Sequence, residues 1–389
     1  MSGPRAAVVG TGFIGVVHVD ALRRLGVEVV GVVGSTPERA REKARAAGLP
    51  EPYDSFEAML EDPRADVVHL ASPNHLHHAQ ATAVLEAGKH VVCEKPLGLD
   101  ARETAELAAL AERSGLVHAV NFNVRFYPQV QEAAARVRAG AVGEVRLISG
   151  GYLQDWLLLD TDWNWRLDPA VGGSLRAVAD IGSHWIDLVT HICGRRVTEV
   201  CADLTTFVPV RHEPVGPVET FGAAGGGETI PHAMETEDAA GLLLRLEGGA
   251  RATAAISQVS AGRRNLCSFE IDGAHGSVAW GSERPEELWL GHRGRPNELL
   301  LRDATLMDPA AAVTTQLPAG HSEGFADTFR ELYRRVYAAA AVGEPPASPL
   351  YPTFADGHES ALIGAAVACS AREARWVAVD EIRTENPLP

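Results

Sequence analysis

Lys95 occupies a position in this sequence where an amine can meet a ligand. It lies in the segment His90–Pro96, whose first half is apolar and β-branched and predicts a strand buried on both faces. Pro96 cannot donate to a sheet ladder and disfavours helix at the preceding residue, so the strand should end near Glu94. Ligands of open α/β sheets bind at the carboxyl ends of the strands. Lys95 is therefore a candidate active-site amine; the alternative is a surface lysine with a solvated tip.

A carboxylate and an imidazole lie four residues apart at Asp180 and His184, within a helix predicted over residues 174–193. Residues at this spacing share one face of a helix, and Asp187 extends the same stripe. A carboxylate in that position can orient an imidazole and favour its protonated form. Because histidine titrates near neutral pH, His184 is suited to act as a general base. The alternative is a surface pair without a chemical role.

The chain opens with a strand, a glycine-rich turn, a helix and a second strand. The turn follows the predicted strand Ala6–Val9 and has glycine at its first, third and sixth positions. In this context the glycines permit a tight turn, backbone approach to a pyrophosphate, and close packing of helix and strand. The helix N-terminus favours an anion. A glycine-rich turn without a ligand is the alternative. We expect a nicotinamide dinucleotide to bind at Gly10, Gly12, Phe13, Ile14 and Gly15.

The segment after the second strand bears on the cofactor's phosphate. In NAD-binding proteins an acidic residue about 20 positions after the fingerprint binds the ribose 2′-hydroxyl. Here Gly34 and the residues after it supply no carboxylate at the strand end. Ser35, Thr36 and Arg39 could hold a 2′-phosphate, which favours NADP(H), although Arg39 could equally be a solvated helix residue. The choice between NAD(H) and NADP(H) stays open.

The order of the predicted elements indicates two domains. Residues 1–122 alternate strands with helices, which predicts a dinucleotide-binding Rossmann domain built on a doubly wound parallel sheet. Residues 123–389 predict an α+β substrate-binding domain with a large, open-faced and mainly antiparallel sheet. Expected strands there cover 145–152, 197–207, 241–246, 250–257, 267–271, 277–280 and 287–290, and expected helices cover 128–139, 174–193, 325–342 and 361–371.

Two features of the second domain lead to further expectations. Residues 211–237 are rich in glycine, proline and glutamate without periodicity, and predict a long mobile loop. A large sheet with one face lacking helices often has a partner, so we expect a homodimer or homotetramer through the open sheet. The covered faces of that sheet should include Leu243, Leu246, Ala254, Ile256, Phe269 and Ile271.

The composition of the chain argues against several classes of protein. The 389 residues are 46% hydrophobic and 22% charged, ordinary values for a globular protein of two domains. A net charge of −16 argues against non-specific nucleic-acid binding and against an anionic membrane surface. No apolar run is long enough to span a membrane, and the N-terminus lacks a signal-peptide core. Five scattered cysteines fit reduced thiols, so we expect a cytoplasmic protein.

Three ordered motifs give the chain a family resemblance. The chain resembles the glucose–fructose oxidoreductase, inositol dehydrogenase and rhizopine-catabolism (Gfo/Idh/MocA) family over essentially its whole length. The motifs that carry the resemblance are the glycine fingerprint, then Glu94-Lys95-Pro96, and then Gly172-Gly173 followed by Asp180…His184…Asp187. Within the family, the stretch Tyr152–Trp156, the pair Trp165-Arg166 and the glycine-rich insertion look most like levoglucosan dehydrogenase and related sugar 3-dehydrogenases, a group that favours NAD. The family implies a Rossmann domain followed by an open-faced sheet domain, with the substrate between them.

The resemblance implies roles for individual residues. Lys95, Asp180 and His184 match the family's catalytic trio; we expect His184 as base, Lys95 as its partner on the alcohol oxygen and Asp180 as orienter, although the sequence does not decide which of Lys95 and His184 moves the proton. An aromatic platform beside polar side chains suits a sugar, so Gln154, Trp163, Trp165 and Arg166 are candidate substrate residues, unless both tryptophans are core. Further cofactor contacts are expected from Ser72, Pro73, Asn74, His78, Glu94, Lys95 and Asn123, the last also near the substrate.

His75, His77 and His78 do not predict a metal site, because they point in different directions on one helical turn and lack a complementary ligand set. The sequence thus predicts an NAD(P)-dependent oxidoreductase acting on a secondary alcohol of a sugar, glycoside, anhydrosugar or cyclitol. Two alternatives remain. One is an NAD-assisted glycoside-cleaving enzyme of the same family; the other is a non-catalytic cofactor or sugar sensor, which would not need Lys95, Asp180 and His184.

Overall fold

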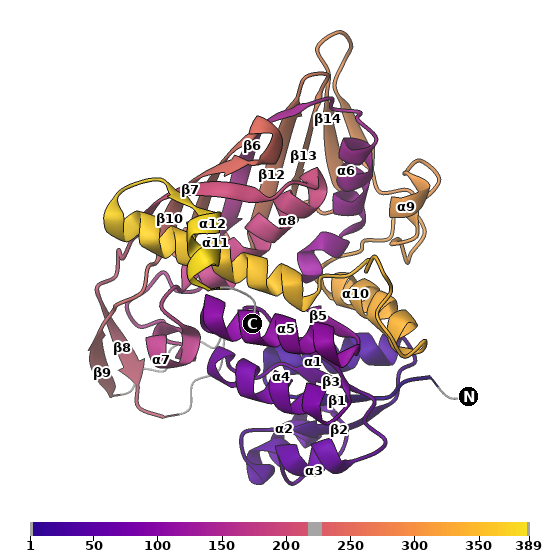
Figure 1. The fold of residues 1–389 in the computed structure, drawn as a ribbon, viewed down its shortest axis with the longest axis vertical. Helices are drawn as coiled ribbons and strands as arrows, with labels where there is room; N and C mark the ends of the chain where they lie inside the picture. The colour runs from indigo at the N-terminus through magenta and orange to yellow at the C-terminus, as the bar shows by residue number, and fades with distance from the viewer. Residues whose placement is uncertain (1–2, 217–227, 387–389) are drawn as a thin grey trace. The chain divides into compact units, whose positions relative to one another are not determined.

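A computed structural model describes residues 3–216 and 228–386, and the chain divides into two compact units (Figure 1). Unit 1 comprises Met1–Asn123, Phe325–Ala361 and Asn386–Pro389, and unit 2 comprises Val124–Gly324 and Leu362–Glu385. The first unit therefore takes a later segment, 325–361, that the sequence analysis placed in the second domain.

Unit 1 is built on a parallel sheet, as the sequence predicts. Within the described residues it has five strands in the order β2-β1-β3-β4-β5. The chain crosses from β2 back past β1 to β3, so the strand order reverses between β1 and β3, the position where doubly wound folds bind ligands. The strands are β1 (Ala6–Val9), β2 (Val29–Val33), β3 (Val67–Leu70), β4 (His90–Cys93) and β5 (His118–Val120), and the helices α1 (Phe13–Arg24), α2 (Pro37–Ala47), α3 (Phe56–Glu61), α4 (His77–Glu86), α5 (Ala101–Ser114) and α10 (Phe325–Ala340).

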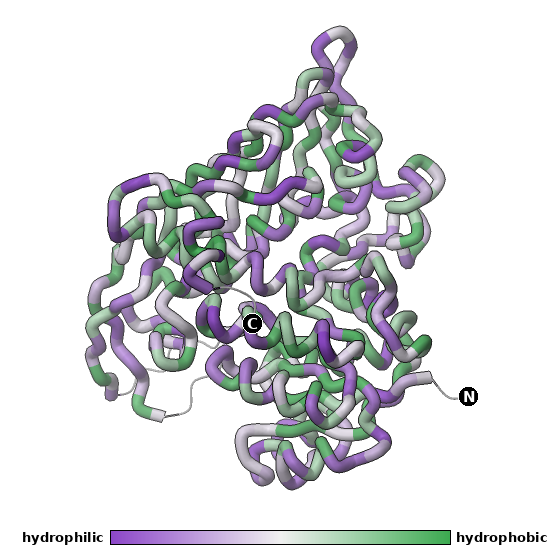
Figure 2. The backbone as a smooth tube through the Cα atoms, in the orientation of Figure 1, coloured by the Kyte–Doolittle hydropathy of each residue, from purple (hydrophilic) through white to green (hydrophobic). Residues whose placement is uncertain are grey.

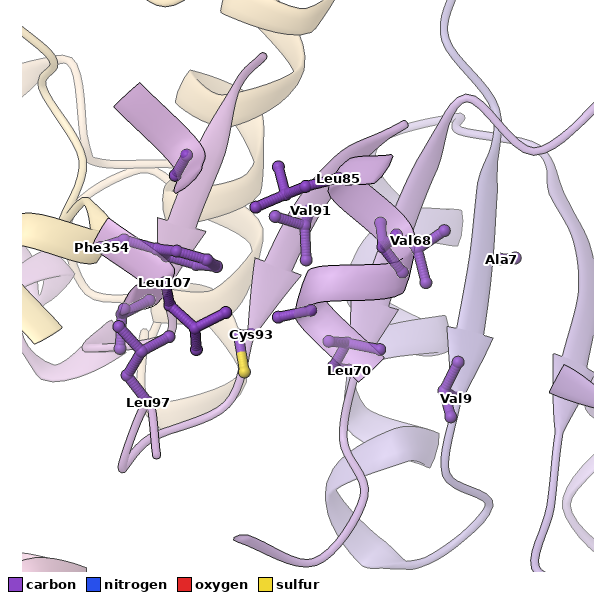
Figure 3. Close-up of a cluster of buried hydrophobic side chains, with 14 of the residues drawn as sticks. Ala7, Val9, Val68, Leu70, Leu85, Val91, Cys93, Leu97, Leu107 and Phe354 are labelled. Carbon is purple, nitrogen blue, oxygen red and sulfur yellow. The ribbon is translucent and has the colours of Figure 1, made fainter. Parts of the chain in front are cut away.

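The core of unit 1 explains why its late segment belongs to it. The strands are runs of buried valine, leucine and alanine covered on both faces, which is typical of a parallel sheet. Phe354, at the start of α11 (Phe354–Glu373), is fully buried in the cluster that contains Val91 and Leu107 (Figure 3). Helix α10 packs against α1. Burial of these apolar side chains holds residues 325–361 to the Rossmann sheet.

Unit 2 is built on a large mixed sheet, in agreement with the predicted fold class. Over the described residues the sheet has nine strands in the order β15-β14-β13-β12-β6-β11-β10-β7-β16, and the β6–β11 pair is parallel. Helices α6 and α8 pack on one face of it (Figure 1). Its strands are β6 (Val145–Leu153), β7 (Val197–Thr205), β10 (Ala239–Leu246), β11 (Arg251–Ser257), β12 (Leu266–Gly273), β13 (Ser277–Gly281), β14 (Glu287–Gly291), β15 (Glu298–Leu301) and β16 (Val377–Ala378).

The helices of unit 2 differ from the prediction at one important place. The segment predicted as one helix over 174–193 contains a π-helical turn, η4 (Val178–Gly182), before the regular helix α8 (Ser183–Cys193). Such turns widen the helix locally and occur often at functional sites. The remaining helices are α6 (Pro128–Arg138), α7 (Pro169–Gly172), α9 (Pro309–Ala312) and α12 (Val379–Glu385).

The prediction of a long loop over 211–237 is wrong for residues 211–214 and 229–233, which lie in strands. Strands β8 (Val210–Pro214) and β9 (Thr229–Ala233) pair antiparallel in a ribbon, which we call the β8–β9 ribbon; residues 217–227 lie outside the described residues. The ribbon is polar, and part of its anchorage comes from distant residues, so its sequence lacks the apolar alternation that marks a strand.

One expected core residue also lies elsewhere. Leu243 is 46% exposed, while Leu242 and Leu244 on either side are buried, because successive strand residues point to opposite faces. Figure 2 shows how this alternation mixes hydrophobic and hydrophilic colour along the strands of unit 2, while the turn between β14 and β15 is largely hydrophilic. Leu243 therefore contributes to the face of the sheet opposite the buried side chains.

Replacing Phe354 with alanine tests the assignment of the late segment to unit 1. Truncating a fully buried phenylalanine removes apolar contact and leaves a cavity, so the free energy of unfolding in urea should fall by about 3–5 kcal/mol. Leu350→Ala is the control, because this side chain is 71% exposed and its loss should cost no more than about 0.5 kcal/mol. Equal effects of the two substitutions would contradict the assignment.

Candidate active site

In the glycine turn after β1, Gly10 and Gly15 are closely packed against backbone, whereas Gly12 is open. Gly10 has φ +114°, and a Cβ there would lie 2.3 Å from the carbonyl oxygen of Ala71. A Cβ on Gly15 would lie 2.0 Å from the carbonyl oxygen of Gly10. Gly12 is the N-cap of α1, and a Cβ there would meet nothing within 4 Å. Backbone is thus open to a ligand at Gly12 and closely packed at the other two glycines.

The N-terminus of α1 fits a dinucleotide pyrophosphate. Its first turn carries no acidic side chain, and Gly12 makes no side-chain cap to the helix. The first amides of a helix and its dipole favour an anion at this end. The side chain of Phe13 is 51% exposed at the same turn. Gly10, Gly12, Phe13, Ile14 and Gly15 are therefore gathered at one helix start beside β3, where the sequence analysis expects the cofactor.

The turn after β2 carries the residues that the sequence analysis proposes for the 2′-phosphate of NADP. Thr36 caps α2, because its hydroxyl oxygen accepts a hydrogen bond from the backbone N–H of Arg39 at 3.3 Å. Ser35, Thr36 and Arg39 are all exposed. The exposed guanidinium of Arg39 and the two hydroxyls lie on one short turn and can meet a phosphate.

The loops after β3 and β4 are tied together by His77. Its Nδ1 lies 2.8 Å from the carbonyl oxygen of Pro96 and its Nε2 lies 2.9 Å from that of Ser72. Burial lowers the pKa of His77, and the two carbonyl contacts oppose this effect. The ring therefore joins the loop that carries Ser72 and Pro73 to the turn that carries Lys95.

Several predicted cofactor residues in these loops also have protein partners. The hydroxyl of Ser72 donates to Gln80 at 2.5 Å, and Asn74 is buried at the start of a short 3₁₀ turn after Pro73. His78 Nε2 lies 2.9 Å from a carboxylate oxygen of Glu106 on α5. The cofactor roles of Ser72, Pro73, Asn74 and His78 stay predictions.

Glu94 faces a buried polar network that the sequence analysis did not find. Its Oε1 lies 3.0 Å from His18 Nε2 and accepts from the amide of Asn121, while its Oε2 accepts the backbone N–H of Lys95 at 3.2 Å. Burial raises the pKa of Glu94, but the hydrogen bond and charge of His18 and the charge of Lys95 outweigh it and hold the pKa below its ordinary value. The network continues from His18 to His69 at 3.1 Å.

Lys95 lies at the carboxyl end of β4, as predicted. The strand ends at Cys93, and the backbone of Lys95 is fixed by Glu94 while its side chain is half-buried. Asn123, predicted to touch cofactor and substrate, is 2% exposed and donates to the hydroxyl of Thr328 at 2.7 Å. This bond gives Asn123 a structural function in unit 1, and its binding role stays a prediction.

Asp180 in unit 2 lies on the π-helical turn, where Gln258 and Arg166 contact its carboxylate. Its Oδ2 accepts a hydrogen bond from the side chain of Gln258 at 2.8 Å, and its Oδ1 lies 3.3 Å from Nε of Arg166. Gln258 directly follows β11, and the sequence analysis missed it because 78 residues separate it from Asp180. The Arg166 contact joins residues 162–166, which carry Trp163 and Trp165 and which we call the aromatic segment, to the turn that carries Asp180.

His184 lies at the second position of α8 and is 8% exposed. Its ring centroid lies 6.2 Å from that of Tyr152 on β6. Asp187, one turn further along, binds Arg125 through both carboxylate oxygens. The stripe of charged residues predicted on this helix is therefore divided between different partners, and Arg125 completes an ion pair within unit 2.

The candidate sugar residues of unit 2 form two aromatic contacts. Trp163 and Trp165 are half-buried, so neither is a fully buried core residue. The guanidinium of Arg166 lies over the ring of Trp165 at 4.3 Å, and Trp163 packs against His232 with ring centroids 4.8 Å apart. The rings thus retain accessible surface beside a cation and an imidazole, an arrangement suited to the C–H face and hydroxyl rim of a sugar.

Gln154 occupies the end of β6 and is held from two sides. Its amide donates to Asn265 at 2.8 Å, and its carbonyl oxygen accepts from the indole N–H of Trp156 at 2.9 Å. Asn265 also accepts from the hydroxyl of Tyr152 at 2.7 Å. Asn265 precedes β12 and carried no local signal, because its partners come from a strand more than 100 residues earlier.

Comparison with known proteins identifies the family. Residues 4–122 match the model described as "Oxidoreductase family, NAD-binding Rossmann fold", and residues 130–279 match the Gfo/Idh/MocA C-terminal domain. Levoglucosan dehydrogenase from Pseudarthrobacter phenanthrenivorans is 30% identical over 398 residues, which cover 98% of this chain and 100% of the relative. The chain belongs to the Gfo/Idh/MocA family of NAD-binding oxidoreductases.

Solved structures of Gfo/Idh/MocA proteins share the fold. A levoglucosan dehydrogenase structure, "complex with NADH and levoglucosan", matches with a TM-score of 0.86 and 28% identity, over 97% of this chain and 100% of that chain. An inositol dehydrogenase homolog complexed with NAD⁺, from Azotobacter vinelandii, matches with a TM-score of 0.83 and 26% identity, over 97% of each chain. The predicted family, fold class and NAD-binding domain are confirmed.

The exposed position of Arg39 after β2 predicts that this residue favours NADP over NAD. Arg39→Ala should lower kcat/KM for NADP by about tenfold, because a charge-assisted contact with the 2′-phosphate is lost. The value for NAD should stay within about twofold, since a ribose 2′-hydroxyl makes no such contact. Initial rates with both cofactors measure the effect. Equal losses with NAD and NADP, or a hundredfold preference of the wild type for NAD, would contradict the assignment of Arg39.

Proposed function

We propose that the protein is an NAD(P)-dependent dehydrogenase acting on a secondary alcohol of a sugar, glycoside, anhydrosugar or cyclitol. The observation that carries the proposal is the contact between Arg166 and Asp180 in unit 2. It joins a segment with half-buried tryptophans to the helical turn bearing a carboxylate and, one turn on, an imidazole. The relatives named for sugar and inositol oxidation support the same substrate class.

The proposed chemistry needs a base at the hydroxyl and a positive charge at its oxygen. The nicotinamide supplies a hydride acceptor when it is bound. His184 takes the hydroxyl proton as general base, and Lys95 donates a hydrogen bond to the same oxygen as its negative charge develops. Asp180, held by Gln258 and Arg166, orients His184 and favours the charged imidazolium.

The aromatic segment of unit 2 supplies the sugar contacts in this proposal. Trp163 and Trp165 offer ring faces to the apolar C–H side of a pyranose, and Gln154 and Arg166 reach its hydroxyls. Burial of apolar ring surface gives affinity, while the hydrogen bonds select among hydroxyl arrangements. Asn123 and the loops after β3 and β4 are assigned to the cofactor and the reacting end of the substrate.

A panel of substrates tests the proposal against its alternatives. Levoglucosan, L-sorbose, free pyranoses, glycosides and inositols are each incubated with NAD and with NADP, while reduced nicotinamide is followed by absorbance. Stoichiometric formation of reduced cofactor and a keto product with at least one sugar or cyclitol is expected. Glycoside cleavage without net reduced cofactor would instead identify a redox-neutral hydrolase, and binding without turnover would identify a sensor.

Lys95→Ala tests the proposed contact between the Lys95 amine and the alcohol oxygen. Turnover of the best substrate should fall by ~10²-fold or more, because the alcohol oxygen loses its positively charged partner. The dissociation constant for NADH, measured by fluorescence, should change by no more than about threefold, because most of the dinucleotide contacts lie elsewhere. Lys43→Ala, on the exposed side of α2, is the control. Turnover within a few-fold of wild type would remove Lys95 from the mechanism.

We also propose that the chain forms a homodimer or homotetramer through the outer face of the nine-stranded sheet, the face opposite α6 and α8. Strand register places Leu243, Ser149, Trp289 and Leu299 in one row across this face. Leu243 and Leu299 are 46% and 54% exposed, and Leu147, two residues from Ser149, is 43% exposed. A sheet face with exposed leucines and the half-buried Trp289 suits a second copy of itself.

Leu147→Asp combined with Leu243→Asp should convert the oligomer to monomer, because carboxylates cannot be buried unpaired at an interface. Light scattering coupled to size-exclusion chromatography measures the molar mass. Leu350→Asp is the control, since Leu350 is 71% exposed in unit 1. A monomeric wild type, or an oligomer that survives the double substitution, would contradict the proposed interface.

A further inference from the structure

We infer that the β8–β9 ribbon is a positioning element for sugar selectivity, acting through the buried side chain of Arg211. The inference rests on the proposed function, because it assigns a task to an element beside the aromatic segment of unit 2. The ribbon comprises residues 210–214 and 229–233, and the contacts that anchor it lie within unit 2.

Arg211 on β8 holds the backbone that leads into the tryptophans. Its side chain is fully buried, and its guanidinium donates to the carbonyl oxygens of Leu157 and Leu159 at 2.8 Å each and lies 3.4 Å from that of Asp162. The backbone N–H of His212 donates to the carbonyl oxygen of Asp160 at 2.8 Å. Strand β8 therefore holds the backbone at four positions between residues 157 and 162, immediately before Trp163.

Asp238 connects Arg211 to the residues that precede the π-helical turn η4. Its Oδ1 accepts from Arg211 at 2.8 Å and also from Arg176, and all three side chains are fully buried. Burial raises the pKa of Asp238, but the backbone N–H of Val208 and the two guanidinium groups outweigh it and hold the pKa below its ordinary value. The carboxylate is thus a charged bridge between β8 and the residue two positions before η4.

Glu237 completes the connection at the beginning of the π-helical turn. Its carboxylate accepts the backbone N–H groups of Arg176 at 3.0 Å and of Val178 at 2.9 Å. The carbonyl oxygen of Asp238 accepts the backbone N–H of Gln258 at 3.0 Å, and the side chain of Gln258 donates to Asp180 at 2.8 Å. Arg211 is therefore linked by hydrogen bonds to the aromatic segment and to Asp180.

The second strand of the ribbon touches the aromatic segment directly. His232 on β9 packs against Trp163, and its Nε2 lies 2.9 Å from Glu213 on β8. The ribbon thus supports Trp163 from the side through His232 and fixes the backbone before it through Arg211. Since ring orientation decides which C–H face of a sugar can stack, this support should set the preference among sugars.

The experiment uses two substitutions in the full-length enzyme. Arg211→Lys keeps the charge but loses the planar fork that reaches two carbonyls and a carboxylate together. KM for the preferred sugar should rise by about tenfold or more, while kcat and the NADH dissociation constant stay within about threefold. His232→Ala, at a half-buried position, removes the ring contact with Trp163 together with the contact to Glu213, and should raise KM by about two- to tenfold. Both should alter the ratio of kcat/KM between two sugars.

Arg302→Lys provides the matched control. Arg302 is another buried arginine of unit 2, bound to Glu286 and Glu323 and to the carbonyl oxygens of Leu317 and His321, next to strand β15. It should cost stability as Arg211→Lys does, with KM and the sugar ratio unchanged. Equal kinetic changes in both variants, or unchanged KM in Arg211→Lys and His232→Ala, would overturn the inference.

Hydrogen–deuterium exchange separates this inference from the proposed function. Peptides covering residues 157–166 should exchange faster in Arg211→Lys than in the wild type or in Arg302→Lys, whether or not any sugar is turned over. Unchanged exchange there would overturn the positioning role even in an active dehydrogenase. Faster exchange in a protein that oxidises no sugar would uphold the anchoring and defeat the proposed substrate class.

Discussion

The approach of the Gly10 backbone to the carbonyl oxygen of Ala71 is the constraint on which unit 1 depends. A Cβ at Gly10 would lie 2.3 Å from that oxygen, so only glycine allows β1 and β3 to end side by side with α1 starting between them. This contact places the N-terminus of α1 at the reversal of strand order, where an anion is favoured. Lys95 follows from the same geometry, because β4 pairs with β3 in parallel and ends at the same edge of the sheet.

Unit 2 depends on buried charge rather than on close backbone packing. The carboxylate of Asp238 forms ion pairs with two fully buried arginines, and their hydrogen bonds to carbonyl oxygens help to offset the cost of removing the charges from water. This cluster fixes the segment before Trp163 and the start of the turn that carries Asp180. These ion pairs and hydrogen bonds hold the segment in place without covering it with apolar surface, and the two tryptophans stay half-buried.

Much of the fold could be predicted from the sequence because its signals are local. Runs of valine mark the buried parallel strands, glycines and Pro96 mark their ends, and alternation marks the antiparallel sheet. The β8–β9 ribbon was missed because Arg211 owes its position to carbonyls about 50 residues away. The partners of Asp180 and Asp187, Gln258 and Arg125, were missed for the same reason, since 78 and 62 residues separate each pair. Leu243 was assigned to the covered face because hydrophobicity does not tell the two faces of a sheet apart.

The central proposal is that His184 and Lys95 act on the oxygen of a sugar carbinol, whose carbon would give up its hydride to a nicotinamide bound in unit 1. The most direct measurement uses the sugar with the highest rate, prepared with deuterium at its ring carbinol carbons, and determines the mass of the reduced cofactor. The account predicts reduced cofactor carrying one deuterium in the wild type, formed with a primary isotope effect on the chemical step. Reduced cofactor without deuterium, or a changed sugar without any reduced cofactor, would contradict it.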